Sequence, residues 1–340
     1  MNTRDLLALP ERQLLALVLE VERRPVDWET GTRIEASRQV LERHASLMFA
    51  EAGLDVAAAA ASLSTSKLLR LDGDAFALTP SGRVVAERCR LEMAANAYGK
   101  RLAAFKMSPA YGVYCDRVYG IALAQYSVLD AEQLNALVQA LAPARHGVIL
   151  DVGCGAGRIA GYVAQRTEST VVGIDIAEAA MKQVPGHAQY AVATAETLPF
   201  APRSIAGAYF IDVLNLCGDV GATLARVAEV MTRGAPLCIF NSEVTSGPDG
   251  ETLALARASS IGRGLSEAGF CWEVRDYSAN ERAIWSHARR AAKELAGAFE
   301  QEGNRSLGAE LLREAERGDR WSSEGRLRRL FYIAQTSDAG

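Results

Sequence analysis

Hydrophobic positions change their spacing near residue 129, and this change divides the chain into two regions. Before it, apolar residues recur every three to four positions, as in segment 14–21, which is the period of a helix with one buried face. Two short apolar runs at 68–71 and 76–78 flank Asp72-Gly73-Asp74, a turn sequence that favours a β-hairpin. The first hundred residues therefore predict helices with one small hairpin.

From residue 129 onward, short apolar runs alternate with helical periods such as 131–141 and 253–268. Seven runs are typical of strands, at residues 147–150, 170–174, 190–192, 206–211, 236–240, 271–277 and 329–334. Strands that alternate with helices predict right-handed crossovers and a parallel sheet covered on both faces. We therefore expect an α/β, Rossmann-like, doubly wound fold with a seven-stranded, mostly parallel sheet.

The two patterns predict two domains joined by a linker. Residues 1–105 should form a mainly helical, winged-helix-like domain, and residues 106–128 a linker or lid. Residues 129–336 should form the Rossmann-like domain, with a helical insertion at about 280–325. A winged-helix-like domain can bind DNA, but in two-domain enzymes it more often pairs two copies or covers a substrate, so a homodimer is reasonable.

Composition and charge exclude several classes of protein. The 340 residues are 49% hydrophobic and 23% charged, as in an ordinary globular chain. The net charge of -4 disfavours nucleic acid as a partner, and we expect Arg326, Arg328 and Arg329 on solvated faces. No apolar run approaches the roughly 20 residues of a membrane span, and the first residues lack a signal-peptide layout. Scattered cysteines and histidines predict no metal site and fit a reducing cytoplasm.

The segment 148–160 is the most informative about chemistry. An apolar run ends at Asp151, and a turn with Gly153, Gly155 and Gly157 leads into a helical pattern. Glycines let a backbone approach a ligand that a Cβ would exclude, and a helix start offers unpaired N–H groups to an anion. A dinucleotide fingerprint would need a small residue where Arg158 stands, so this spacing departs from the nicotinamide pattern.

Other polar residues follow the next predicted strands. Asp175 stands about twenty residues after the first glycine, where an acid accepts hydrogen bonds from both hydroxyls of a ribose. Ala195-Glu196 follows the third strand, and Asp212-Val213-Leu214-Asn215 follows the fourth. In open α/β sheets the carboxyl ends of the strands form the ligand-binding edge.

At these residues the chain resembles the class I S-adenosylmethionine-dependent methyltransferases that act on small molecules. The resemblance extends over about residues 129–245 and implies S-adenosylmethionine as the cofactor. It implies that the cofactor is bound by Asp151, Gly153, Gly155, Gly157, Asp175, Ile176, Ala195, Glu196, Asp212 and Asn215. The chain departs from the family at Thr194, where many relatives have an acid. It also departs at Asn215 and Leu216, which replace histidines, so no histidine base is expected there.

Four residues are candidates for the reaction itself. Tyr111 and Tyr114 lie in a segment that resembles the lid of small-molecule methyltransferases, although an ordinary packing helix explains the pattern equally well. Glu243, after the predicted strand 236–240, is a candidate base or binds an acceptor amine. His287 has a side chain suited to proton transfer, although a lone histidine more often has no catalytic role.

The resemblance implies in-line methyl transfer to a small molecule, in secondary metabolism. Two alternatives stay open. The same fold can support other chemistry of S-adenosylmethionine, such as an intramolecular cyclisation that releases methylthioadenosine. A ligand-sensing DNA binder without enzymatic activity is the other alternative, and the acidic turn Asp72-Gly73-Asp74 disfavours it because it opposes phosphate contact.

Overall fold

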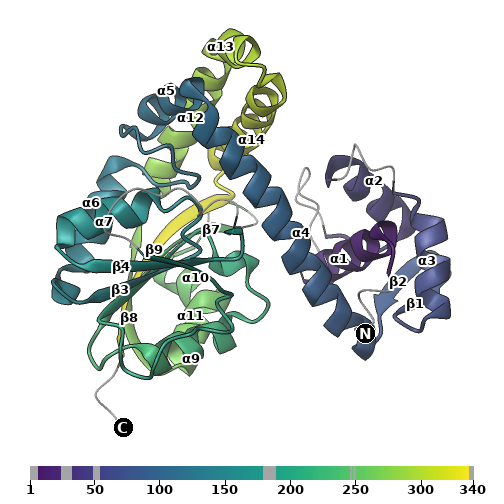
Figure 1. The fold of residues 1–340 in the computed structure, drawn as a ribbon, viewed down its shortest axis with the longest axis horizontal. Helices are drawn as coiled ribbons and strands as arrows, with labels where there is room; N and C mark the ends of the chain where they lie inside the picture. The colour runs from purple at the N-terminus through teal and green to yellow at the C-terminus, as the bar shows by residue number, and fades with distance from the viewer. Residues whose placement is uncertain are drawn as a thin grey trace. The chain divides into compact units, whose positions relative to one another are not determined.

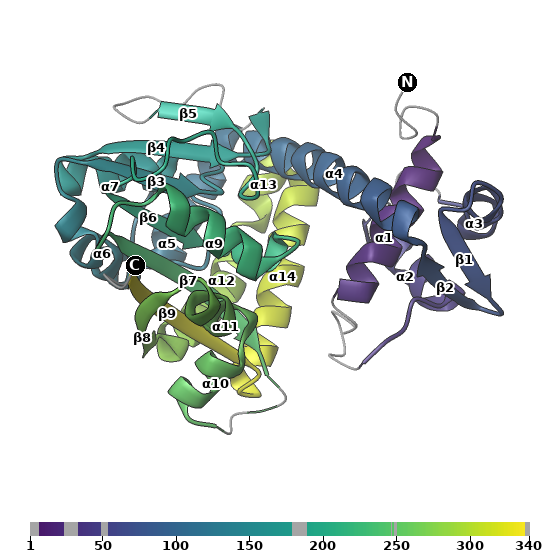
Figure 2. The same cartoon turned by 90° about the horizontal axis from the view of Figure 1, so that it is seen from below.

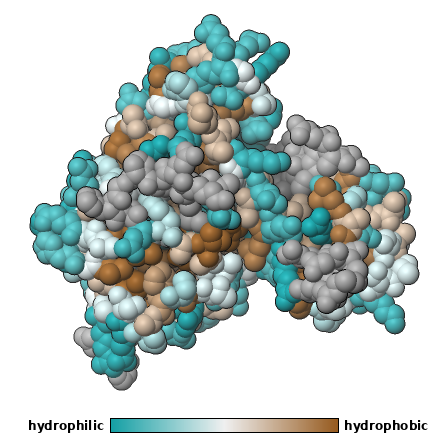
Figure 3. Space-filling view, in the orientation of Figure 1, coloured by the Kyte–Doolittle hydropathy of each residue, from teal (hydrophilic) through white to brown (hydrophobic). Residues whose placement is uncertain are grey.

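The structure, a computed structural model, describes residues 7–23, 33–48, 54–178, 189–245, 247 and 250–336. The chain forms two compact units, Met1–Ala97 and Tyr98–Gly340. Figure 1 shows the helices and strands of both units. In the described part of the chain, every helix is too short or too polar to cross a lipid bilayer. On the face shown in Figure 3, hydrophobic side chains form small patches between hydrophilic ones.

The first unit consists of helices around a small hairpin, as predicted. Its elements are α1 (Leu9–Arg23), α2 (Arg38–Met48), α3 (Val56–Thr65), β1 (Leu69–Asp72), β2 (Ala75–Leu78) and the start of α4 (Pro80–Met107). The hairpin turns at Gly73, whose φ of +58° favours glycine. Its apolar core draws on α1, α2, α3 and the hairpin, with Leu14 and Leu63 fully buried.

Helix α4 begins at Pro80, a residue well suited to the first turn of a helix. The Thr79 hydroxyl accepts a hydrogen bond from the Gly82 N–H at 3.0 Å and so satisfies a first-turn donor. A Cβ on Gly82 would lie 1.8 Å from the Leu68 carbonyl oxygen. Glycine is therefore required where α4 starts beside the hairpin.

The second unit contains the predicted seven-stranded sheet. Its strands are β3 (Val148–Val152), β4 (Thr170–Asp175), β5 (Gln189–Val192), β6 (Gly207–Ile211), β7 (Pro236–Val244), β8 (Phe270–Asp276) and β9 (Leu327–Thr336). Their order is β5-β4-β3-β6-β7-β9-β8, and β9 runs antiparallel to both its neighbours while the other pairs are parallel. The strand order reverses between β3 and β6, where doubly wound sheets bind ligands. The predicted Rossmann-like fold is confirmed.

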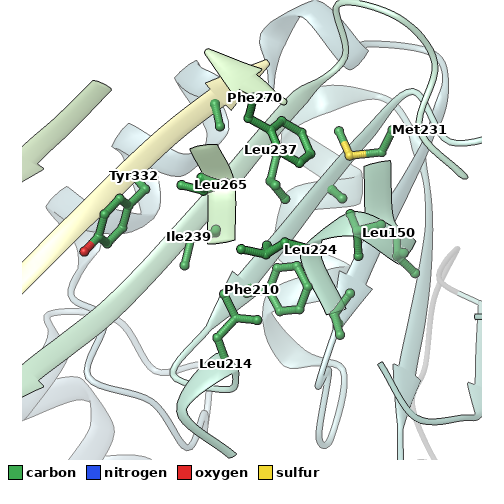
Figure 4. Close-up of a cluster of buried hydrophobic side chains, with 14 of the residues drawn as sticks. Leu150, Phe210, Leu214, Leu224, Met231, Leu237, Ile239, Leu265, Phe270 and Tyr332 are labelled. Atoms are coloured by element: carbon green, nitrogen blue, oxygen red, sulfur yellow. The ribbon is translucent and has the colours of Figure 1, made fainter. Parts of the chain in front are cut away.

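Helices cover both faces of this sheet (Figure 2). One face packs on α9 (Val220–Val230), α10 (Thr252–Ala258) and α11 (Ser260–Glu267) through the buried cluster in Figure 4. The other face packs on α6 (Ala131–Ala140) and α7 (Arg158–Thr167). The short 3-10 helices Ala142–Ala144 and Leu214–Leu216 complete the connections. The sequence also predicts a helix at 178–183, which lies outside the described residues beyond its first position.

The predicted insertion is present between β8 and β9 as α12 (Ser278–Glu294), α13 (Ala296–Gln301) and α14 (Arg305–Ser323). One long helical segment was expected, and the structure shows three helices because the chain turns at Leu295 and at Gly303, which has a φ of +74°. The helices are not merely a solvated surface. They share a buried cluster with α5 (Pro109–Tyr119), which includes Phe299 and Ala315.

The single helix predicted at 253–268 is wrong, since the chain breaks at Ser259 into α10 and α11. The Ser259 hydroxyl caps α11 by accepting a hydrogen bond from the Gly262 N–H at 3.0 Å. A Cβ on Gly262 would lie 2.0 Å from the Ala256 carbonyl oxygen. Serine as a cap and glycine at a close backbone approach together explain the break.

Candidate functional site

The glycine turn between β3 and α7 has the conformation that the sequence predicts. Gly153, Gly155 and Gly157 have φ angles of +78°, +51° and +66°, which side chains rarely adopt. The Gly153 and Cys154 N–H groups both donate to the Ile174 carbonyl oxygen, at 2.8 and 3.0 Å. Among the described residues no side chain caps α7 at Gly157, so the start of that helix can offer its first amides to a polar group.

Two of these glycines are also required by their neighbours. A Cβ on Gly153 would lie 2.3 Å from a methyl carbon of Val213, and a Cβ on Gly157 would lie 2.2 Å from the Tyr190 hydroxyl oxygen. A Cβ on Gly155 would lie 3.4 Å from Leu102, in the second half of α4. The turn is therefore packed against β5, against the segment after β6 and against α4.

Asp175 lies at the carboxyl end of β4 and is half-buried. Its carboxylate accepts hydrogen bonds from the Gly155 and Ala177 N–H groups, both at 2.8 Å. The two bonds fix the carboxylate directly beside the glycine turn, and each carboxylate oxygen retains a lone pair for a further donor. Asp175 can therefore bind hydroxyl groups of a ligand held by the turn.

Four further predicted residues stand near the same edge of the sheet. Ile176 is half-buried directly after Asp175, and Ala195 is 8% exposed after β5. Glu196 is exposed and accepts a hydrogen bond from the Gly218 N–H at 3.4 Å. Asn215 is exposed in the short helix after β6. The cofactor roles of these residues stay predictions.

Asp151 lies inside the sheet rather than at its surface. It is 3% exposed and accepts a hydrogen bond from the Tyr209 hydroxyl at 2.8 Å. Burial raises the pKa of Asp151 to about 7, and the nearby Asp175 acts in the same direction. A direct contact between this carboxyl group and the cofactor stays a prediction.

Asp212 follows β6 with a φ of +57°, and its carboxylate already has partners. The Val128 N–H donates to it at 3.0 Å, and the Arg329 guanidinium binds both oxygens, at 3.2 Å for the longer contact. The expectation that Arg329 lies on a solvated face is wrong. Its side chain is fully buried, stacks over the Phe240 ring at 5.4 Å and donates to Gln133 at 3.1 Å.

Tyr111 and Tyr114 share one buried face of α5, as the spacing predicts. Ser108 caps this helix by accepting the Tyr111 N–H at 3.1 Å, and the Tyr111 ring stacks on Phe105 at 3.9 Å. The Tyr111 hydroxyl donates to the Gln125 carbonyl oxygen at 2.5 Å, and burial raises the pKa of Tyr111 well above its usual value. Lid function and catalysis by these tyrosines stay predictions.

Glu243 and His287 are not brought together with the tyrosines. Glu243 is half-buried on β7, where it accepts a hydrogen bond from the Asn241 amide at 3.1 Å, and burial raises its pKa. Its neighbour Ser242 points to the opposite face of the sheet, since side chains alternate along a strand. His287 is exposed on α12. Their catalytic roles also stay predictions.

Glu281 of α12 is a buried carboxylate that the sequence pattern does not single out as a site residue. It is 1% exposed and accepts hydrogen bonds from the Ser242 hydroxyl at 2.7 Å and the Trp285 indole N–H at 3.1 Å. Burial raises the pKa of Glu281, while Arg329 and these two bonds act in the opposite direction. In the sequence, Glu281 stands three residues before Ile284, which places both on one face of the helix. This spacing is the one sign of the burial of Glu281 in a segment that is otherwise highly charged.

Relatives of known sequence agree with the chemistry of this edge. Residues 150–239 match a family model described as "Methyltransferase domain". An O-methyltransferase of Penicillium expansum, cnsE, is 33% identical over 130 residues, which are 36% of this chain and 47% of the relative. An O-methyltransferase of Pyrenophora dematioidea is 30% identical over 159 residues, 40% of this chain and 59% of the relative. The chain thus spans about half the length of the curated relatives it matches.

Solved structures share the fold. A phosphoethanolamine N-methyltransferase of Haemonchus contortus, solved with S-adenosyl-L-methionine, superposes with a TM-score of 0.54 at 17% identity. The superposition covers 67% of this chain and 60% of that chain. At this identity the likeness extends to the fold alone.

Proposed function

Because the chain belongs to the class I S-adenosylmethionine-dependent methyltransferases, we propose that it transfers a methyl group from S-adenosylmethionine to a hydroxyl oxygen of a small molecule. The observation that carries the proposal is the half-buried Asp175 carboxylate bonded to the Gly155 amide at the carboxyl edge of the sheet. The choice of oxygen rests on the curated relatives, which are named O-methyltransferases.

The residues at this edge fit the cofactor. The positive φ angles at the three glycines keep side chains away from the turn, and the uncapped start of α7 offers N–H groups to polar atoms. Asp175 would bind the ribose hydroxyls, with Ile176 and Ala195 as the apolar residues next to the adenine. When bound, S-adenosylmethionine supplies a methyl group that its sulfonium has already activated.

The protein's own task is then to place an acceptor oxygen in line with that methyl group and to exclude water. Fixing two reactants in a productive geometry can contribute roughly 7–11 kcal/mol to lowering a barrier. Leu102 of α4 packs near Gly155, and α5 follows directly in the chain. The proposed cover of the site is α5, which lies in the segment 106–128 that the sequence predicts as a lid, together with the end of α4.

Isothermal titration calorimetry with S-adenosylhomocysteine tests the cofactor site. The wild-type chain should bind it, and Asp175→Ala should largely abolish binding while the circular dichroism spectrum stays unchanged. Asp74→Ala, at the exposed hairpin turn of the first unit, is the matched control and should bind like the wild type. Unchanged affinity in a folded Asp175→Ala variant would contradict the proposed site.

Mass spectrometry tests the reaction. A metabolite extract incubated with the protein and methyl-labelled S-adenosylmethionine should yield a labelled methyl ether. Label found on nitrogen or carbon would contradict O-methylation while leaving methyl transfer intact. Methylthioadenosine released without any acceptor would instead establish the intramolecular cyclisation.

We further propose that two copies pair through the first unit and that the enzyme acts in the cytoplasm, in secondary metabolism. The winged-helix-like arrangement of helices and hairpin supports pairing by analogy. The six cysteines are scattered along the sequence with no close pair, as a reducing compartment favours. Light scattering of the full chain should give about twice the 36.5 kDa of one copy, and the mass of one copy would refute pairing.

A further inference from the structure

A buried polar network lies at the carboxyl edge of the sheet, where β6, β7, β9 and α12 meet. Arg329 of β9 binds the carboxylate of Asp212, directly after β6, and donates to the Ser242 hydroxyl of β7 at 3.1 Å. Ser242 in turn donates to Glu281 of α12 at 2.7 Å. The network therefore joins Arg329 to two carboxylates: to Asp212 directly, and to Glu281 through the Ser242 hydroxyl.

The two oxygens of Glu281 differ in their surroundings. Oε1 accepts two hydrogen bonds, from Ser242 and from the Trp285 indole. Oε2 is buried and has no hydrogen-bond partner in the described part of the chain. A buried carboxylate oxygen without a donor is costly. A structural role explains Oε1 but leaves Oε2 unexplained, and a ligand that donates a proton would satisfy it.

The network lies at the same edge of the sheet as the glycine turn. Phe240 of β7 is in register with Ile211, the last residue of β6, so Ser242 lies beyond the end of β6. Val213, the residue after Asp212, contacts Gly153 of the glycine turn. The network and the cofactor turn are therefore neighbours at the same edge of the sheet.

We propose that Glu281 is the catalytic base that removes the proton of a phenolic hydroxyl group in the acceptor. This inference rests on the proposed O-methylation. The phenolic O–H bond breaks and its proton passes to Oε2 of Glu281. The oxygen forms a bond to the methyl carbon, and the electron pair of the broken carbon–sulfur bond stays on sulfur, which yields S-adenosylhomocysteine. The proton then leaves Glu281 for water.

The remaining groups act as positioning residues. Ser242 and Trp285 hold Oε1 and so leave Oε2 for the acceptor, while the positive charge of Arg329 favours the ionised form of Glu281. A phenol ionises near pH 10, as a tyrosine side chain does, and is within reach of a carboxylate base, whereas an alkyl alcohol is a far weaker acid. Glu243 does not fit this role, because it lies on the opposite face of β7 from Ser242.

The test compares Glu281→Gln with the wild type on two probe acceptors, phenol and the more acidic 4-nitrophenol, at about pH 8. Loss of a general base costs about 10²–10⁴-fold in rate. Glu281→Gln should lose kcat to this extent on phenol and only a few-fold on 4-nitrophenol, which ionises without help. Its KM for S-adenosylmethionine should stay within about twofold. Glu281→Asp should restore part of the rate, and the exposed Glu300→Gln of α13 should match the wild type.

A second readout does not depend on turnover. Both proteins are loaded with S-adenosylhomocysteine and 4-nitrophenol. In the wild type, the negative charge of Glu281 should keep the bound 4-nitrophenol neutral. In Glu281→Gln, the bound 4-nitrophenol should ionise and show the absorbance of its phenolate. Equal rates and spectra for wild type and Glu281→Gln would overturn the assignment. Labelled methyl transfer by the wild type to a non-phenolic hydroxyl oxygen, with none to either phenol, would overturn it while leaving the proposed function intact. Absence of any transfer would refute both.

Discussion

Asp151 should make the stability of the chain fall as the pH rises from about 4 to about 7. Its carboxyl group is buried within β3, where burial raises its pKa from 3.8 to about 7. In the unfolded chain the group loses its proton near pH 3.8, so in this interval the folded state binds a proton that the unfolded state has lost. The free energy of unfolding must then decrease with pH. The contribution is complete below the lower pKa and lost above the higher one.

The magnitude follows from the two pKa values. Each tenfold change in the dissociation constant corresponds to about 1.4 kcal/mol, so the whole displacement corresponds to about 4 kcal/mol. Asp151→Asn cannot ionise and retains an oxygen that can accept the Tyr209 hydroxyl proton. The difference in unfolding free energy between wild type and Asp151→Asn should therefore shift by about 1.4 kcal/mol per pH unit within the interval, in favour of the variant as the pH rises.

Urea unfolding of the cofactor-free chain measures this difference. Three of the four tryptophans, Trp272, Trp285 and Trp321, belong to the second unit, so fluorescence reports mainly on its unfolding. Titrations at about pH 5, 6, 7 and 8 should show the two curves diverging up to pH 7 and running parallel above it. Asp116→Asn, at an exposed position of α5, is the control and should follow the wild type. Parallel curves for wild type and Asp151→Asn throughout would refute the reasoning.

Three further changes test the packing of the site by urea unfolding. Gly157→Ala should destabilise the chain by about 1–2 kcal/mol or more, because the backbone of alanine is strained at a φ of +66°. Gly161→Ala in α7 is the control: its Cβ has open space, and the variant should be more stable by up to about 1 kcal/mol. Arg329→Met should cost about 3–5 kcal/mol by leaving Asp212 without its cation, and adding Asp212→Asn should recover part of it. Tyr111→Phe should cost about 1 kcal/mol for the lost hydrogen bond.

The local chemistry of the chain is sufficient to predict the cofactor turn. Gly153, Gly155 and Gly157 are separated by single residues between an apolar run and a helical period, and the structure shows all three with positive φ. Asp175 could be placed beside them because parallel strands end at one edge of the sheet. These predictions depend on contacts within about 25 residues of sequence and on a general rule of α/β sheets.

Long-range contacts explain where the predictions stop. Arg329 looks like a surface arginine within its charged neighbourhood, and its burial depends on Asp212, which lies 117 residues earlier in the chain. The break between α10 and α11 depends on how closely Gly262 approaches Ala256, a distance that no periodicity encodes. Glu281 stands among the charges of α12, and only the path of β7 shows that it faces Ser242.

If Glu281 is the base, as proposed, the acceptor contacts residues that the matched family model does not contain. The match to the methyltransferase model ends at residue 239, before Ser242, Glu281, Trp285 and Arg329. Asp212 is the one residue of the network that lies within the matched segment. It binds Arg329 of β9 and so connects that segment to the rest of the network. Since α12 supplies both Glu281 and Trp285, substitutions in this helix should change the acceptor preference while leaving cofactor affinity unchanged.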